Sequence, residues 1–298
     1  MAKVSTMTKI KRMQIGRKLA LAFLCAIVLY PLWMLISVSL SSEADISKYG
    51  YLLIPKKIDF AAYKYVFSNP TAIIDAYKVT FFFSVVAMVL SVILQSMIAY
   101  PISKKTFTGK RGLSFYLYFT MLFGGGMVPS YILLTRYLHL DDTIFIYILP
   151  ALISPWNVFM MRTFFSQIPN EIGESVTVDG GSEFRIYWQF ILPLSKPVLA
   201  TIALLTFLGK WNSWSESMLY ITNPKLYSLQ FLLQEIMQKI ELLQNQNVGM
   251  TVQMNVSEIP SETARMAMAM VVAGPALVVF PFFQKYFVKG LTVGSVKG

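Results

Sequence analysis

The sequence has few of the residues from which soluble proteins build their surfaces and catalytic sites. Only 14% of its 298 residues are charged, against about 25% in a typical soluble domain. Long windows carry no charge at all, so charged side chains cannot cover a soluble globule. There is one cysteine, Cys25, and one histidine, His139, which excludes an internal disulfide and leaves no His/Cys metal cluster. The composition predicts an integral membrane protein that holds no metal.

The glycine-rich loop with which ATPases bind phosphate is also missing. Gly109 and Lys110 are followed by Arg111, and the upstream glycine of the G-x-x-x-x-G-K-[ST] pattern is absent. We therefore expect no catalytic residue and no cofactor bound by this chain, which is not expected to be an enzyme. Energy for transport would have to come from another subunit or from an ion gradient.

What the sequence does contain is a series of uncharged segments long enough to cross a membrane. A helix needs about 20 apolar residues to span a hydrocarbon core of about 30 Å. Five uncharged windows reach or approach that length: Leu19–Leu40, Val79–Ser103, Gly112–Thr135, Thr143–Met161 and Met266–Gln284. A sixth, Pro197–Gly209, reaches about 24 residues only with a mostly uncharged extension to Tyr220. The expected fold class is an all-α membrane protein with six transmembrane helices.

The first window follows a basic segment and could be mistaken for a signal peptide. Its 22 uncharged residues exceed the about 7–15 of a signal sequence, and no clear cleavage site follows. We expect a retained membrane anchor.

The basic residues gather on one side of the predicted membrane. Six spans put both termini on a side that holds 16 basic and 4 acidic residues, whereas the other side holds 10 and 11. Because cytoplasmic loops are enriched in lysine and arginine, both termini are predicted to be cytoplasmic. The net charge of +11 then reflects topology, and no nucleic-acid partner is expected. The expected organisation is a cytoplasmic segment 1–18, a spanning domain 19–287 and a cytoplasmic tail 288–298.

One predicted cytoplasmic loop, residues 162–196, departs from this charge pattern because it is net acidic. Pro169 and Asn170 are typical of a helix start, and the acids that follow suit the positive end of the helix dipole. Asp179-Gly180-Gly181 ends that helix, and a second helix begins at Ser182. The pattern predicts a helix–turn–helix against the membrane. Its composition fits an ordinary interfacial loop as well as a surface for a protein partner.

The same loop resembles a known sequence pattern. It contains two runs spaced like E-A-A-x-x-D-G-A and L-P-L-x-x-P, which are Glu174–Gly181 and Leu192–Pro197. These runs are similar to the EAA loop in permease subunits of binding-protein-dependent ABC importers, above all the second permease of maltose-type carbohydrate systems. The segments around Gly124–Gly126, Trp211-Asn212 and Gln284–Gly290 also resemble that family. Its alanines are replaced here by Ser175, Val176 and Gly181.

The resemblance implies a fold, a location and a set of partners. The fold is that of type I ABC importer permeases in the bacterial cytoplasmic membrane, with the loop as a coupling helix. The implied partners are a second homologous permease in a heterodimer, two ATPase subunits that bind ATP and Mg, an extracytoplasmic solute-binding protein, and membrane lipid. The implied substrate is an oligosaccharide, of the branch that carries acidic fragments of alginate or pectin. The residues expected to contact the ATPase are Glu174, Ser175, Val176, Asp179, Gly180 and Gly181.

Within that contact, the resemblance implies that Glu174 anchors a basic group and that Gly180 and Gly181 permit close approach. The acidity of the loop supports a protein partner independently, since a loop that only binds anionic lipid should be basic.

Two other classes of membrane protein remain open. An ion-coupled secondary transporter needs charged residues within its spans, and only Lys210 and Glu216 lie in one. Six residues apart, they do not share a helical stripe, so both are expected to face the outer water layer or the mouth of the substrate pathway. A membrane scaffold without transport would give no reason for the acidic loop and its spacing.

Two groups of residues are candidates for the substrate pathway. A run of glycines in the third window fits either close packing or a kink, or else a gating bend. Aromatic and amide side chains in the extension after Gly209 fit either interfacial anchors or a surface that stacks on sugar. These candidates are Gly124, Gly125, Gly126, Trp211, Asn212 and Trp214.

Residues 221–263 are predicted to form a long external loop. Its first part, Tyr227–Leu243, has apolar residues at helical spacing. About 40 residues is long for a mere connection. The resemblance implies that this loop enters the cleft of the binding protein and helps to release the substrate, whereas a plain exposed loop is the alternative.

Overall fold

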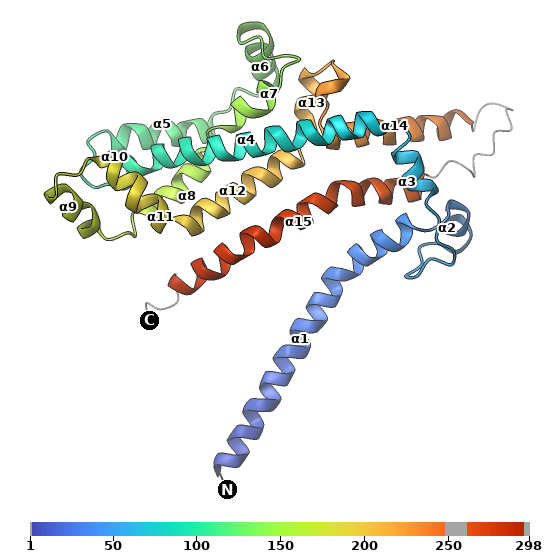
Figure 1. Ribbon diagram of the computed structural model, residues 1–298, viewed down its shortest axis with the longest axis horizontal. Coiled ribbons are helices and arrows are strands. Elements are labelled where there is room, and N and C mark those ends of the chain that lie inside the picture. Colours follow the sequence, from blue (N-terminus) through green and yellow to red (C-terminus); the bar gives the residue numbers. More distant parts are fainter. Residues whose placement is uncertain (1, 248–260, 295–298) are drawn as a thin grey trace. The chain divides into compact units, whose positions relative to one another are not determined.

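The computed structural model describes residues 2–247 and 261–294, and the side chains of residues 14–242 and 261–284. Throughout this described part the regular structure is helical. Three helices are long and apolar enough to cross a membrane by themselves: α1 (Ala2–Ser39), α4 (Pro70–Ser103) and α15 (Glu262–Gly294). They contain the first, second and last of the predicted windows, and Figure 1 shows their length. The predicted all-α fold is confirmed.

Three further pairs of helices pass the same test together, each bent at a short break. The first joins α5 (Lys110–Leu122) to α6 (Met127–Ile132) and η1 (Leu133–Tyr137), with a bend of 111°. The second joins α7 (Phe145–Ile148) and η2 (Leu149–Ala151) to α8 (Pro155–Phe165), with a bend of 47°. The third is bent by 78° and joins α12 (Lys196–Trp211) to the preceding elements α10 (Glu183–Ile186), η3 (Tyr187–Ile191) and α11 (Leu192–Leu194).

The chain forms two compact units, residues 1–69 with 235–273 and residues 70–234 with 274–298. In the second unit, α4 packs along α8 and α12 (Figure 1). The buried face of α4 carries small or polar side chains, which permit close helix approach in membranes. They are Thr80, Ser84, Ala87, Ser91 and Gln95, each 0% exposed.

Gln95 contributes directly to the broken fourth window. Its side-chain Nε2 donates to the carbonyl oxygen of Leu152, 3.0 Å away, at the break between η2 and α8. A break in a spanning helix frees backbone carbonyls that lipid cannot satisfy, so a neighbouring side chain must supply the donor. Gln95 therefore stabilises the bent form of this span.

The sequence predicted one span from Pro197 to Tyr220, but this segment does not form a single helix. Helix α12 ends at Trp211, and α13 (Ser215–Tyr220) begins after a break. The residues at the break bind backbone and side-chain groups in place of continuing the helix: Asn212 Nδ2 donates to the Leu208 carbonyl at 2.9 Å, and Ser213 Oγ donates to Glu216. Such local bonds compete with helix propagation. With 16 residues, α12 is about 24 Å long.

The first unit contains α1, the short helices α2 (Glu43–Tyr49) and α3 (Ala61–Val66), and the start of α15. Residues 51–53 fold back along α1, where Trp33 Nε1 donates to Leu53 O at 2.8 Å and Ser37 Oγ to Leu52 O at 2.7 Å. Farther from that end, α1 exposes its apolar side chains, including Phe23 and Leu24.

The predicted external loop is confirmed to begin with a helix. After the short η4 (Pro224–Leu226), α14 runs over Leu229–Asn247, and its apolar residues Leu229, Leu233 and Ile240 are buried. Residues 248–260 of the loop lie outside the described residues, as does the tail beyond Gly294. The start of the loop is held by Asp142, whose Oδ1 accepts the backbone N–H groups of Thr222 at 2.6 Å and Asn223 at 2.8 Å.

Candidate functional site

The acidic loop folds as the helix–turn–helix that its sequence predicts. Its first helix, α9, covers Asn170–Val178 and follows Pro169. Glu171 lies in the first turn, where a carboxylate is stabilised by the positive end of the helix dipole. Asp179 ends the helix, and the Gly181 N–H donates to Val176 O at 2.8 Å. Ser182 then caps α10, with its Oγ accepting the Arg185 N–H at 3.3 Å.

The two glycines of the turn have different structural roles. Gly180 has φ +76°, a backbone conformation that disfavours other residues, and a Cβ at this position would meet nothing within 4 Å. At Gly181 a Cβ would lie 2.4 Å from Val176 Cγ1 and 2.8 Å from Val176 O. Both were expected to admit a partner closely. The close approach at Gly181 is instead to Val176 of the same chain, and only Gly180 faces open space.

Replacing Gly181 with alanine is expected to lower the free energy of unfolding by about 1–3 kcal/mol, the usual cost of overpacking. The double variant with Val176→Ala should lose less than the two single losses added together, because it removes the 2.4 Å clash, although it also removes buried apolar atoms. Thermal unfolding of the purified protein measures both. Gly173→Ala in α9 is the control, since a Cβ at Gly173 would make only an ordinary contact, 3.9 Å from Ile186. Equal melting of Gly181→Ala and wild type would contradict this account.

Most of the predicted contact residues are brought to one exposed surface. Glu174, Ser175, Asp179 and Gly180 are exposed, and Val178 is exposed to 87%. Val176 points the other way: it is 7% exposed and belongs to a core cluster with residues of α4, α8 and α12. We call the exposed residues Glu174–Gly180, without Val176, the loop surface. A single exposed apolar side chain is common on protein surfaces, so Val178 by itself does not identify a partner.

A second contact, absent from the sequence prediction, ties the loop to the end of α4. Glu183, the first residue of α10, accepts a hydrogen bond from Tyr100 Oη at 2.7 Å and forms an ion pair with Lys104. Lys104 also lies 4.8 Å from the centre of the Tyr100 ring. The sequence contained a signal for this contact, because Glu183 and Lys104 lie in two loops that were both predicted to be cytoplasmic. Figure 1 places α9 and α10 near this end of α4.

The candidates at the break after α12 lie in different environments. The Trp211 ring is 2% exposed, with ring centres of Phe207 at 5.8 Å and Tyr77 at 6.2 Å. Asn212 is exposed, and Trp214 is 38% exposed. As the chain is folded here, only the latter two offer a free face to a sugar. Their role in the substrate pathway stays a prediction.

The break also brings together two charges that a straight helix would separate. Lys210 Nζ lies 2.8 Å from Glu216 Oε1, and their side chains are only 14% and 20% exposed. Ser215 Oγ donates to the other carboxylate oxygen at 3.0 Å. The two residues were expected to face the outer water layer or the mouth of the substrate pathway, on different stripes of one helix. They form a largely buried ion pair instead, because the chain turns between α12 and α13.

The glycines of the third span lie at the sharpest of the three bends, 111°. Gly124, Gly125 and Gly126 are not helical, and Gly126 has φ +84°. A Cβ at Gly124 or Gly126 would meet nothing within 4 Å, so these glycines do not serve close packing in this conformation. They serve the bend. Whether this bend lines the substrate pathway stays a prediction.

Among the described residues, no group of three or more His, Cys, Asp or Glu side chains could hold a metal ion.

Residues 68–293 match the family described as the inner membrane component of binding-protein-dependent transport systems. The chain belongs to this family. Its members are the inner membrane components of transport systems that depend on a binding protein.

Individual relatives of this permease cover nearly its whole length. Protein LplC of Bacillus subtilis (strain 168) is 37% identical, over 92% of this chain and 90% of the relative. A polygalacturonan/rhamnogalacturonan transport system permease protein of the same organism, YtcP, is 34% identical over 95% and 96%. A chain from the crystal structure of a bacterial ABC transporter that imports the acidic polysaccharide alginate has a TM-score of 0.76 and 30% identity, covering 93% of this chain and 97% of that one.

Proposed function

We propose that this chain is one of two permease subunits of an ABC importer that carries an acidic oligosaccharide across the bacterial cytoplasmic membrane. Its partners are a second, homologous permease, two ATPase subunits that hold ATP and Mg, and an extracytoplasmic solute-binding protein. Both termini lie in the cytoplasm, so that the loop surface faces the ATPase. The observation that carries the proposal is the loop surface, which is exposed on the short helix α9, while Val176 of the same helix packs against α4, α8 and α12.

The anchoring explains how force from an ATPase would reach the spans. Val176 fixes α9 to the core formed by α4, α8 and α12, and Glu183 fixes α10 to the end of α4. A shift of α9 is therefore transmitted to at least three helices, because tightly packed side chains leave little room for independent movement. In this reading Glu174 contacts a basic group of the ATPase, and Gly180 lets the turn enter a cleft.

The acidic substrate class is inferred from two relatives. Polygalacturonan consists of sugars that carry carboxylates, and the solved importer carries alginate, an acidic polysaccharide. Both relatives cover more than 90% of this chain, so the likeness includes the spans as well as the loop.

An ion-coupled carrier is a weaker alternative. It requires a charge in the spans that can exchange a proton or an ion. The charged pair at the break after α12, Lys210 and Glu216, is neutralised internally, since each side chain is the partner of the other. Each side chain therefore stabilises the ionised form of the other, which disfavours the gain or loss of a proton by the pair.

The test is to tag this chain in its native membrane, identify the proteins that purify with it, and measure uptake of labelled oligogalacturonate. We expect an ATPase, a sister permease and a binding protein, with uptake that stops on ATP depletion and survives a protonophore. A binding protein that prefers a neutral maltooligosaccharide would overturn the acidic substrate class. Purification of the chain alone, with uptake that a protonophore abolishes, would overturn the ABC assignment.

A further inference from the structure

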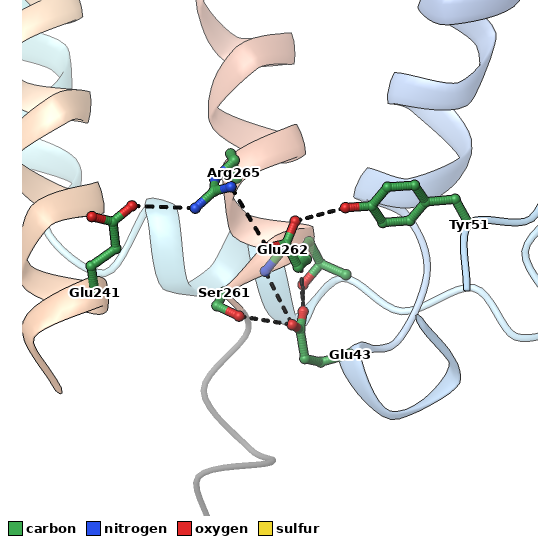
Figure 2. A network of polar contacts seen from close by, with 7 residues as sticks. Glu43, Tyr51, Glu241, Ser261, Glu262 and Arg265 are labelled. Atoms are coloured by element: carbon green, nitrogen blue, oxygen red, sulfur yellow. Dashed lines mark hydrogen bonds and ion pairs between the residues drawn. The ribbon is translucent and has the colours of Figure 1, made fainter. Parts of the chain in front are cut away.

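Glu43 makes four hydrogen bonds with residues that follow it by 218 to 220 positions in the chain. Its Oε1 accepts from Ser261 Oγ at 2.9 Å and from the Glu262 N–H at 3.0 Å. Its Oε2 accepts from the N–H of Thr263 at 3.0 Å and from Oγ1 of the same threonine at 2.8 Å. Figure 2 shows the carboxylate facing the first turn of α15. All these residues belong to the first compact unit.

The arrangement is a helix cap supplied by a distant segment. The first N–H groups of a helix have no partner within it, and a residue just before the helix usually accepts them. At α15 that task falls to a carboxylate from the chain that follows α1. A negative charge at a helix N-terminus is further stabilised by the helix dipole. Because α1 ends at Ser39 and α15 starts at Glu262, Glu43 links the first and last spanning helices.

The surrounding charges support the same link. Tyr51 Oη donates to Glu262 Oε2 at 2.8 Å, and Arg265 lies 3.6 Å from Glu262 and 3.3 Å from Glu241 (Figure 2). Three stretches of sequence thus meet at the start of α15: the residues after α1, the end of α14, and α15 itself. Arg265 compensates part of the negative charge of the three glutamates.

The ionised form of Glu43 is favoured in this environment. Partial burial alone would raise its pKa, but the hydrogen bonds from Thr263, Glu262 and Ser261 outweigh burial and hold the pKa below its ordinary value. A lowered pKa means that the cap contributes its full stability at neutral pH. That stability is lost only as the pH falls through the lowered pKa.

We propose that Glu43 is a positioning residue that joins the outer ends of the first and last spanning helices, so that they move as one body during transport. The proposal rests on the chain being a transport permease, but it does not depend on which solute is carried. A rigid joint at this place would leave rearrangement to the broken spans, whose glycine, serine and proline breaks supply bends.

A covalent bridge in place of the carboxylate tests this joint. The test protein is the full transporter with Cys25→Ser, Glu43→Cys and Thr263→Cys, compared before and after treatment with a short bifunctional thiol reagent. We expect uptake at least about tenfold below wild type before treatment, since one charged hydrogen bond is worth about tenfold and all four to Glu43 are removed. Bridging should return uptake to within about twofold of wild type. Bridged protein that transports no better than the unbridged form would show that the two ends must separate, and would overturn the proposal.

Three further variants separate positioning from general destabilisation. Glu43→Gln removes the charge and puts an NH₂ group against the donors of Thr263, so uptake should fall by about tenfold. Glu43→Asp keeps the charge and should recover most of the uptake. Asp75→Asn, at an i,i+3 pair with Lys78 whose side chains are 47% and 74% exposed, is the matched control and should change nothing. Equal uptake in Glu43→Gln and wild type would contradict the proposal. Absence of uptake in the wild-type transporter would instead show that the proposed substrate is wrong.

Discussion

Replacing Gly180 with tryptophan is expected to abolish uptake while leaving the amount of protein in the membrane unchanged. A Cβ at this position meets nothing within 4 Å in this chain, so the indole would extend into open space in the isolated subunit. The ATPase that the loop surface is proposed to contact would collide with it. Loss of a central interface contact costs on the order of a hundredfold, and we expect at least that loss in labelled-sugar uptake. ATP hydrolysis should no longer respond to the loaded binding protein.

The control for this variant is Gly180→Ala. Because Gly180 has φ +76°, alanine carries the backbone strain of the left-handed region, about 1 kcal/mol, without the bulk of an indole. It should therefore lose a small part of the stability and keep most of the uptake. If tryptophan were tolerated as well as alanine, the turn would not enter a cleft on the ATPase.

The second large effect is expected at the ion pair of the fifth span. Glu216→Ala leaves Lys210 charged and largely buried without its carboxylate, a change that costs about 3–5 kcal/mol. The melting temperature of the purified transporter should fall by about 10 °C, measured by a thermal shift assay. Asp75→Ala removes one member of an ion pair with Lys78, whose side chains are 47% and 74% exposed, and should lower the melting temperature by less than about 2 °C.

The double variant Lys210→Met with Glu216→Leu distinguishes burial from function. Two apolar residues of similar volume should restore most of the stability, since buried pairs are often replaced without loss. Uptake should return with stability, because the proposed importer uses no charge at this position. A stable double variant without uptake would show that the pair takes part in transport.

The helical class and the ends of several elements were predictable because their signals are local. A long uncharged window defines α1, α4 and α15, and Pro169, Asp179 and Ser182 mark where the loop helices begin or end. These signals act over a few residues, through capping, backbone freedom and the hydrocarbon thickness. The sequence therefore indicated the exposed turn at Gly180 without any knowledge of its neighbours.

The breaks in the spans were less predictable, because a bend depends on what packs beside it. The glycines at Gly124–Gly126 allowed a kink but did not determine its angle of 111°. The helix break at Asn212 and Ser213 was read as a polar end of a continuous span. For that reason the pairing of Lys210 with Glu216 was missed: spacing along an ideal helix separates two residues that the turn brings within 2.8 Å.

Contacts between distant segments lay beyond the sequence argument. Val176 and Gly181 each departed from an alanine of the family pattern, and only the structure shows that the larger side chain occupies the space left by the smaller residue. Glu183 was an ordinary acid until its partners Tyr100 and Lys104 were known. The bonds of Glu43 span 218 residues or more, and no local pattern signals a partner at that separation.

The cap at Glu43 has a consequence for the biosynthesis of the protein. Its carboxylate enters the membrane with the first helix, but Ser261, Glu262 and Thr263 do not yet exist. At about 5–20 residues per second of translation, the intervening 218 residues require about 10–40 s. During that interval the partners of Glu43 are water molecules, and four spans are inserted before α15 arrives. The contacts of Glu43 with the start of α15 are therefore among the last native contacts to form. A truncated chain that stops before α15 is expected to be cleaved more readily by proteases near Glu43.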